Sequence, residues 1–587
     1  MKGDEKVKVI DKIKNTLVSI KNSVKRFPIT IGVSIVLVIS LIYLNEVGSH
    51  INIEKREVLR RVNMVIGLGL PLSLCIGLIK ERLLEKEKYK GILFYLVGII
   101  VLVLYYFFLL KDFDMVSITR YLGSILFLIL AFYYIPWMGK GKSYEDYVIK
   151  VFSSFFLTII YSFVLYFGIS AILITIDKLF DVYIQSKIYY YMFLVVAIIF
   201  GLSLFLSRIP TSEEKFENYI YPKSLKILLL YIVIPLITIY TAILYAYFAK
   251  ILITRQWPKG LVSHLVLWYS TLSVGVIFFI TPVENKWGKF FKTWFPKLVL
   301  PILFMMFVSI GIRIRQYGIT ENRYYVLALG LWVMGIMIYF SGKKPIKNIV
   351  VPISLSIVIL NSIFGPLSSY SLSELSQNKR FEKILLRNEM LVHGEIQKKP
   401  DIPVEDKEEI SNIITYFSNN HSLADIKYLP MDFKIADMED IIGFPYATPY
   451  YPGAESYFYY SVNLWQEPLV IKDYDYYINI NSWNNKIIIV DNMDISYDKS
   501  NNTLTLIEGE KILFSKNITD YIEKIHEIKG SNPKNMSEIK LKDMTFEEEN
   551  ENVKVKIVFI NSSGRIEGKD KLILENMECI LLVHKKK

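Results

Sequence analysis

The sequence predicts a polytopic α-helical membrane bundle of about 11 transmembrane helices, followed by a soluble α+β extracytoplasmic domain. Three observations predict this fold class. Hydrophobic residues make up 52% of the 587 residues, and charged residues only 21%. The mean hydropathy is +0.34, which is not typical of a soluble domain of this length. The hydrophobic residues gather in long runs before residue 367, whereas the distal part contains strand-like segments separated by turn residues.

Hydrophobic runs of membrane-spanning length define the bundle, which we expect over residues 28–366. The hydrocarbon core of a bilayer is about 30 Å thick and takes about 20 apolar residues in a helix. Eleven runs reach or approach that length: 28–45, 62–79, 91–110, 119–138, 151–175, 188–207, 227–249, 261–281, 297–312, 323–340 and 348–366. The positive charges fall between these runs and not on one soluble face, so nucleic acid is not an expected partner.

The distribution of lysine and arginine predicts the orientation, because cations resist translocation. Segments on the same side as the N-terminus hold 27 Lys+Arg, and the opposite loops hold 14. We therefore expect a cytoplasmic N-terminus, and an odd number of spans places the C-terminal domain outside. Residues 1–27 carry eight Lys+Arg and three acidic residues. This basic amphipathic segment either lies on the anionic inner leaflet or serves only as a retention signal for topology.

Residues 367–400 are expected to form an amphipathic helix and a linker. Leu375, Phe381, Leu385 and Leu386 are spaced for one helix face, and Gly394 then breaks the pattern. The pattern predicts that this segment joins the bundle to a separate distal domain.

Residues 401–587 are expected to form that distal domain, and their charge distinguishes it from the bundle. Residues 1–400 hold 47 Lys+Arg and 24 Asp+Glu, a net charge of +23, whereas residues 401–587 hold 21 and 32, a net charge of −11. Helical and strand-like patterns alternate, which predicts an acidic α+β domain with its own core. The expected helices lie at about 404–419 and 517–529, and the expected strands within 456–515 and at about 552–561 and 570–584.

Standard catalytic signatures are missing from the sequence. It contains no P-loop, no zinc-protease HExxH motif, no GxSxG and no GxGxxG after a strand. The six histidines have no ligand spacing, and Cys75 and Cys579 are too far apart in sequence to suggest a metal motif. We therefore expect no cofactor and no metal. The tyrosine-rich segment 444–477 either lines a glycan or peptide groove or forms ordinary sheet surface and core.

Charged residues at the predicted outer ends of the spans give the best candidate site. Cations on the translocated side oppose the topological bias, so they need partners or a purpose. An arginine fork suits phosphate, so an anionic lipid head group or a polyprenyl phosphate is the candidate ligand. The alternative is that these charged residues bind no ligand and only anchor the helix ends, through snorkelling side chains and local ion pairs. The candidate pocket residues are Arg120, Lys250, Arg313, Arg315, Glu321 and Arg323, with Glu46, Asp177 and Asp181 as acidic partners.

Several segments resemble a family of bacterial multi-pass membrane proteins. The most specific are YGITENRYY and YSLSELSQNKR, and others include SITRYLG and ITIDKLFDVYI. The family is known as a domain of unknown function, number forty-one fifty-three, and the resemblance covers roughly residues 25–400. It implies an integral protein of the bacterial cytoplasmic membrane, and it implies no activity.

Three functions from different classes remain open. The first is a non-enzymatic cell-envelope protein that binds, senses or scaffolds, with envelope proteins or glycans as partners of residues 401–587 and the lipid bilayer around its spans. The second is an extracytoplasmic transferase that uses a polyprenyl-phosphate-linked donor, for which the outer arginines would hold phosphate. The third is a membrane transporter with helices broken at its binding site. The missing catalytic motifs and the large acidic domain favour the first.

Overall fold

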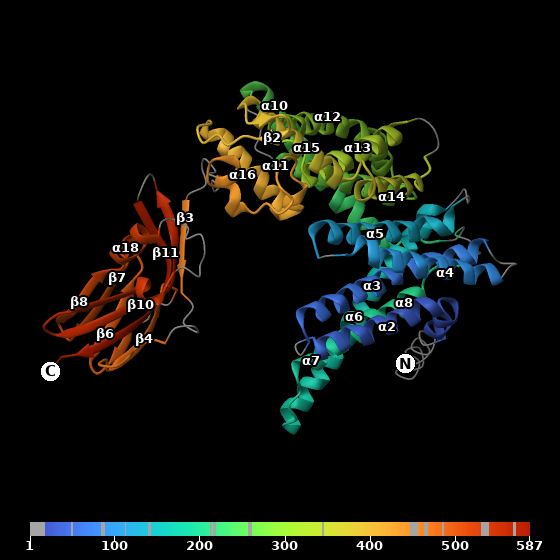
Figure 1. Cartoon of the computed structure of the whole chain (residues 1–587). Helices are drawn as coiled ribbons and strands as arrows, with labels where there is room; N and C mark the ends of the chain where they lie inside the picture. The colour runs from blue at the N-terminus through green and yellow to red at the C-terminus, as the bar shows by residue number, and fades with distance from the viewer. Residues whose placement is uncertain are drawn as a thin grey trace. The chain divides into compact units, whose positions relative to one another are not determined.

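The computed structural model divides the chain into two compact units, Met1–Thr448 and Pro449–Lys587 (Figure 1). The described residues are 18–48, 51–83, 88–111, 113–138, 143–211, 214, 216, 219–255, 261–342, 346–446, 456–462, 468–483, 487–529, 539–567 and 571–586. Residues 1–17 of the predicted basic segment and parts of the tyrosine-rich segment lie outside them.

The first unit is a bundle of long apolar helices. Within the described residues, ten helical segments are long and apolar enough to cross a membrane, and the shorter Val350–Ile363 is an eleventh apolar helix. The helical elements are α2 Pro28–Val47, α3 Ile53–Leu83, α4 Lys88–Leu104 with η1 Tyr105–Leu109, α5 Met115–Tyr134 with η2 Ile135–Trp137, α6 Tyr144–Phe180, α7 Ser186–Leu194, η3 Val195–Gly201, α8 Leu202–Leu206, α9 Lys223–Ile227, η4 Leu228–Val233, α10 Ile234–Thr254, α11 Leu261–Ile280, α12 Lys286–Tyr317, α13 Glu321–Ser341 and α14 Val350–Ile363. The predicted membrane bundle is confirmed.

The surface of the bundle is apolar, as a protein in lipid requires. On α6, the side chains of Ile160, Phe163 and Val164 are 56%, 61% and 65% exposed. Between helices, small hydroxyl side chains are buried, and Ser73 of α3 donates to Thr30 of α2 over 3.1 Å. Small residues of this kind let membrane helices approach closely. Apolar side chains face outward and small polar ones inward, so the chain is a multi-pass membrane protein.

Several helices are longer than the apolar runs that predicted them. The run 297–312 is the centre of the 32-residue helix α12. The first two turns of α12 contain Lys286, Lys289 and Lys292, which lower the hydropathy without interrupting the helix. Lysine has good helix propensity and extends its charge to the membrane surface. Hydropathy therefore found each span but underestimated the helix around it.

Polar contacts mark one end of the bundle, which we call the Arg26 end. Arg26 forms a two-pronged ion pair with Glu81 at the end of α3, with its shorter contact at 2.6 Å. One residue further along α3, Arg82 donates to the carbonyl of Ile135 over 2.8 Å. The opposite end, at which α5 and α13 begin and α12 finishes, we call the Arg120 end.

Helix α14 connects the two ends although it has only 14 residues. Before it, the Asn348 amide donates to Glu145 Oε1 over 2.6 Å, at the start of α6 and therefore at the Arg26 end. At its last residue, the carbonyl of Ile363 accepts from Arg120 over 3.3 Å. The segment 348–363 thus runs antiparallel to α5 across the bundle. The eleventh apolar run therefore crosses the helical bundle from the Arg26 end to the Arg120 end.

A helical cap follows α14 within the first unit. Its elements are α15 Ser369–Arg387, the two-stranded β1 Leu391–Val392 and β2 Glu395–Ile396, α16 Val404–Asn420, η5 Leu423–Asp425, η6 Ile435–Asp437 and α17 Met438–Ile442. Phe381 and Leu385 of α15 are buried with Ile414 and Phe417 of α16. The cap therefore has a small core of its own.

Two expectations about this region differ from the structure. The helix expected at 404–419 was assigned to the distal domain, but as α16 it packs against α15 in the first unit, and the boundary between units falls at Thr448 and Pro449. Leu375 and Leu386 are exposed, whereas Phe381 and Leu385 are buried. At 3.6 residues per turn, positions 375 and 386 share a face that is rotated away from 381 and 385.

Among its described residues, the second unit contains two antiparallel sheets and one α-helix. One sheet has the order β3-β10-β11-β4, with β9 also paired to β10, and the other has the order β5-β6-β7-β8. The elements are β3 Ser456–Ser461, β4 Tyr476–Asn481, β5 Ile488–Val490, β6 Met493–Asp498, β7 Thr503–Glu508, β8 Lys511–Asn517, α18 Thr519–Lys529, η8 Leu541–Met544, β9 Thr545–Glu549, β10 Val553–Glu567 and β11 Lys571–Lys585. A single core contains Leu506 of the second sheet, Leu581 of the first and Ile522 of α18. The predicted α+β character is confirmed.

Candidate functional site

The predicted acidic partners lie around the first turn of α7 and the end of α6. Glu46 accepts from the Tyr191 hydroxyl over 2.6 Å and forms an ion pair with Lys187 at 2.9 Å. Asp177 accepts from the backbone of Ile184 over 3.3 Å. Asp181 ends α6 with a left-handed backbone, φ +50°. Among the described residues, no ion pair or hydrogen bond joins these three carboxylates to the predicted arginines.

The predicted cations do not form a single group. Lys250 is exposed near the end of α10, and Arg315 is exposed in the last turn of α12. Arg313 is half-buried, and its charge acts on Arg323 across the turn between α12 and α13. Arg120 lies over the ring of Tyr370 at 5.6 Å in addition to its bond to α14. The structure thus brings Arg313 near Arg323 and holds Arg120 against α14 and α15.

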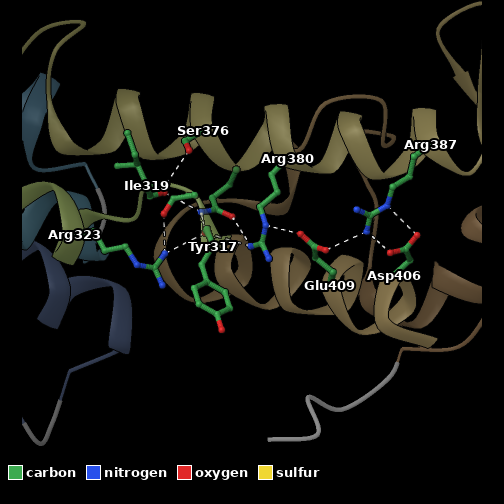
Figure 2. A network of polar contacts seen from close by, with 10 residues as sticks. Tyr317, Ile319, Arg323, Ser376, Arg380, Arg387, Asp406 and Glu409 are labelled. Atoms are coloured by element: carbon green, nitrogen blue, oxygen red, sulfur yellow. Dashed lines mark hydrogen bonds and ion pairs between the residues drawn. The ribbon is translucent and has the colours of Figure 1, made fainter. Parts of the chain in front are cut away.

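The turn between α12 and α13 is the centre of a polar network (Figure 2). Gly318 has φ +70°, and a Cβ at this position would lie 2.9 Å from the side-chain nitrogen of Gln377. Only glycine combines this left-handed backbone with such a close neighbour. Arg323 donates from one nitrogen to the carbonyls of Tyr317 and Gly318, over 3.1 and 2.8 Å. The predicted ligand-binding arginine therefore fixes the turn.

Helix α15 attaches to the same turn from the cap side. Gln377 donates to the carbonyls of Tyr317 and Ile319 over 3.1 and 2.8 Å. Ser376 accepts from the backbone nitrogen of Ile319 over 2.8 Å, and Arg380 donates to the Tyr317 carbonyl over 3.3 Å. Backbone groups that would otherwise lack partners at the helix ends are satisfied by the cap. The turn and α15 therefore form one polar joint.

Ion pairs continue from this joint along α15 and α16, as Figure 2 shows. Arg380 contacts Glu409 at 2.6 Å, and Arg387 contacts Glu409 at 3.2 Å as well as Asp406. The hydrogen bond to Asp406 raises the pKa of the Arg387 guanidinium. Asn388 also donates to Asp406 over 2.6 Å. These ion pairs hold α15 against α16.

A second joint links the bundle to the end of α16. Glu321, the first residue of α13, accepts from Tyr416 over 2.6 Å and lies 2.7 Å from Nε2 of His421. Only 4% of the His421 side chain and 16% of the Glu321 side chain are exposed. Burial raises the pKa of the Tyr416 hydroxyl most, and the hydrogen bond to Glu321 raises it further. Glu321 is thus used by the cap and not by the arginines on α12.

Sequence reasoning did not find Tyr416, His421, Gln377, Arg380 or Glu409. Tyr416 and His421 are five residues apart at the end of a helix, a spacing with no characteristic meaning. Arg380, Arg387 and Glu409 resemble ordinary charges of a solvated helix face. The YSLSELSQNKR motif, which contains Gln377 and Arg380, is the one signal in the sequence that points to this part of the network. Within the described residues, no group of three or more His, Cys, Asp or Glu is placed to hold a metal ion.

The lipid-facing helices and the polar joints at one end define an integral multi-pass membrane protein with a structured cap. A family model described as "Domain of unknown function (DUF4153)" matches residues 31–390, and the chain belongs to this family. The match covers the bundle and α15, as the resemblance predicted.

The chain is also similar to an uncharacterized protein of Pasteurella multocida (strain Pm70). The two are 26% identical over 328 residues, which is 55% of this chain and 55% of that protein. The chain therefore spans about half the length of the curated relative it matches. No solved structure matches the chain.

Proposed function

We propose that this DUF4153 protein is a non-enzymatic component of the bacterial cell envelope whose membrane bundle and cap display residues 449–587 to an extracytoplasmic partner. The observation that carries the proposal is the combination of a cap bonded to the bundle and a second unit with its own core. A polar joint at the membrane surface suits an anchor. A separately folded sheet unit suits recognition of a protein or a glycan.

The orientation is part of the proposal. It rests on the excess of Lys+Arg on the N-terminal side, 27 against 14. It also rests on the crossing of α14, which gives the ten long spans an eleventh partner and an odd total. Under the positive-inside rule, the Arg26 end is cytoplasmic and the cap lies outside.

The bonding of the arginines supports anchoring over catalysis. Arg323 donates to two backbone carbonyls, and Arg380 is paired with Glu409. A transferase that held a donor phosphate would need these groups for its ligand. Their existing contacts stabilise the turn between α12 and α13, which supports the binding and scaffolding role.

The proposal is tested by complementing a deletion strain and measuring competitive fitness. One variant ends after Thr448 and lacks the second unit. The other is R313A/R315A, which leaves Arg323 and its bonds to the turn in place, and its matched control is K55A/R56A, which removes two exposed cations from the same end of the bundle. We expect the truncation to lose complementation and both double variants to keep it, at equal membrane levels on immunoblots. Loss only in R313A/R315A, with the truncation active, would favour the transferase and overturn the display function.

A further inference from the structure

An apolar groove faces the lipid between four helices at the Arg120 end of the bundle. It has a volume of about 480 Å³. Its walls come from α3, from α4 with its π-helical extension η1, from α5 and from α14. Residues that define these walls are Leu68, Val101, Phe108, Phe127, Leu360 and Phe364. The groove is open on its lipid side, where the side chains of Val101 and Phe108 are 48% and 68% exposed.

The longest wall of the groove, formed by α4 and η1, is comparable in length to one leaflet of a bilayer. Along α4 and η1 the lining residues run from Val101 to Leu109. Eight residue steps at about 1.5 Å give about 12 Å. Half of a hydrocarbon core of about 30 Å is about 15 Å. One acyl chain of a phospholipid therefore fits along it, whereas a polyprenyl chain would extend well beyond it.

Two arginines lie at the Arg120 end of this groove without acidic partners. Arg61 of α3 lies over the ring of Tyr106 at 4.5 Å and donates to its carbonyl over 3.3 Å. Its Nε is buried and has no hydrogen-bond partner. In the part of the chain that the structure describes, the one hydrogen bond of Arg120 on α5 goes to the Ile363 carbonyl. Among the described residues, no carboxylate lies within ion-pair distance of either guanidinium.

The register of α3 and α5 places these two arginines at similar heights along the helix axes. Cys75 bonds to the carbonyl of Leu128, and Arg82 bonds to that of Ile135, so residues on the two helices that differ by 53 in number lie side by side. Arg61 is then level with residue 114, six residues from Arg120, or about 9 Å along the axis. Asp114 at this level uses Oδ1 to cap α5 through the Ser117 nitrogen, 2.7 Å away.

The π-helical segment η1 lines the groove and also contacts Arg61. The ring of Tyr106 contacts the Arg61 guanidinium. The neighbouring Tyr105 lines the groove, and its hydroxyl lies 3.5 Å from the Ser124 hydroxyl, one turn beyond Arg120. Helical segments of this kind are frequent at functional sites. A guanidinium at a membrane surface is stabilised by an anion, and a phosphate accepts two of its N–H groups at once.

We propose that this groove binds one anionic phospholipid of the bilayer, with an acyl chain between α4 and α14 and the phosphate at Arg61 and Arg120. The groove supplies apolar contact for the chain, and the two unpaired cations supply selectivity for a negative head group. The inference goes beyond the display function, and it concerns other residues than the two polar joints at the α12–α13 turn and at Glu321.

The binding is tested on the full-length protein by counting retained lipids with native mass spectrometry. The protein is reconstituted with equal amounts of phosphatidylglycerol and phosphatidylcholine and then released from the bilayer. We expect wild-type protein to retain phosphatidylglycerol selectively. R61Q/R120Q is expected to lose about tenfold in this selectivity, as removal of charge-assisted contacts predicts. The control R315Q, an exposed cation at the same end, is expected to leave it unchanged.

A second variant pair tests the groove without touching the cations. V101W fills the groove from its lipid side, and I100W adds the same bulk at a neighbouring position that is 57% exposed and does not line the groove. V101W is expected to reduce retention of phosphatidylglycerol at least fivefold relative to I100W. Equal retention in V101W and I100W would overturn the proposal, as would equal retention of the two lipids by wild type. Displacement of phosphatidylglycerol by equimolar undecaprenyl phosphate would assign the site to a polyprenyl lipid and also overturn it.

Discussion

Glu321 accepts hydrogen bonds from two residues of the cap, so the first turn of α13 is bonded to the end of α16. Tyr416 and His421 both approach the same oxygen, Oε1, and their own polar atoms lie 2.9 Å apart. Such a compact group is stable only when every member has a partner, because each is largely buried. The carboxylate therefore determines whether this joint forms.

Replacement of Glu321 by alanine is expected to destabilise the attachment of the cap. E321A removes the carboxylate that Tyr416 and His421 share as acceptor, and a hydrogen bond to a charged group contributes about 1.5–3 kcal/mol. Thermal unfolding in detergent, with hydrogen exchange of α16 as a local readout, measures the loss. N322A, at the exposed neighbouring position, serves as the control. Unchanged exchange of α16 in E321A would mean that the joint contributes no stability.

Glu374 on α15 predicts a dependence of stability on pH. Burial, followed by the negative charge of Asp425, raises the pKa of its carboxyl above the usual 4.5. A carboxyl whose pKa is raised in the folded state stabilises that state below its unfolded pKa, and this contribution is lost as the pH rises through the folded pKa. Ionised Glu374 therefore opposes folding at neutral pH.

We expect E374Q to raise the melting temperature at pH 7 and to have little effect at pH 4. Glutamine cannot ionise, so the variant lacks the decrease that wild type shows as the pH rises above about 4.5. E395Q, at an exposed position on β2, is the matched control. A gain at pH 4 as large as the gain at pH 7 would contradict the electrostatic explanation.

At the scale of elements, the β10–β11 hairpin organises the second unit. The two strands pair from Val553 opposite Lys585 to Glu567 opposite Lys571, and the other strands of this sheet attach to them. The register shifts beside Gly564, where the strands approach so closely that a Cβ would lie 1.9 Å from the Ile573 carbonyl oxygen. A glycine in a strand interior often marks such a close backbone approach.

G564A is therefore expected to destabilise the second unit by about 1–3 kcal/mol or more, because the neighbouring backbone must move. Hydrogen exchange of β10 and β11 in the full-length protein measures the effect, and exchange in the bundle is expected to stay unchanged. S563A, one residue earlier in the same strand and half-buried, controls for loss of strand propensity. If the amides of β10 and β11 exchange at the same rate in both variants, the close approach at Gly564 does not restrict the residue at this position.

At the scale of the whole molecule, orientation depends on whether α14 crosses the membrane. The helix covers about 21 Å at about 1.5 Å per residue, less than a hydrocarbon core of about 30 Å. Asn348 and Ile363 nevertheless form contacts at opposite ends of the bundle, so the segment extends from one end of the bundle to the other. In the orientation that we propose, the cap therefore lies on the opposite side of the membrane from the N-terminus.

Alkaline phosphatase fusions test this crossing directly, since the enzyme is active only when exported. A fusion after Ser341 is expected to be inactive, and fusions after Ser368 and Lys587 are expected to be active. Green fluorescent protein at the same positions is expected to give the opposite pattern and serves as the control. Equal phosphatase activity after Ser341 and Ser368 would show that α14 does not cross, and the C-terminal unit would then be cytoplasmic.

The sequence by itself determined the membrane bundle, the number of apolar segments, the α+β character of the distal part and the family. These features depend on composition and periodicity, which act over one helix or strand at a time. The network of Arg323, Gln377 and Arg380 and the joint at Glu321 were decided only by tertiary structure. Their partners come from helices up to 100 residues apart in sequence, and no local pattern encodes such a pairing. The same physical reason explains why charges predicted as one outer pocket separate into contacts of α7, of the cap and of α14.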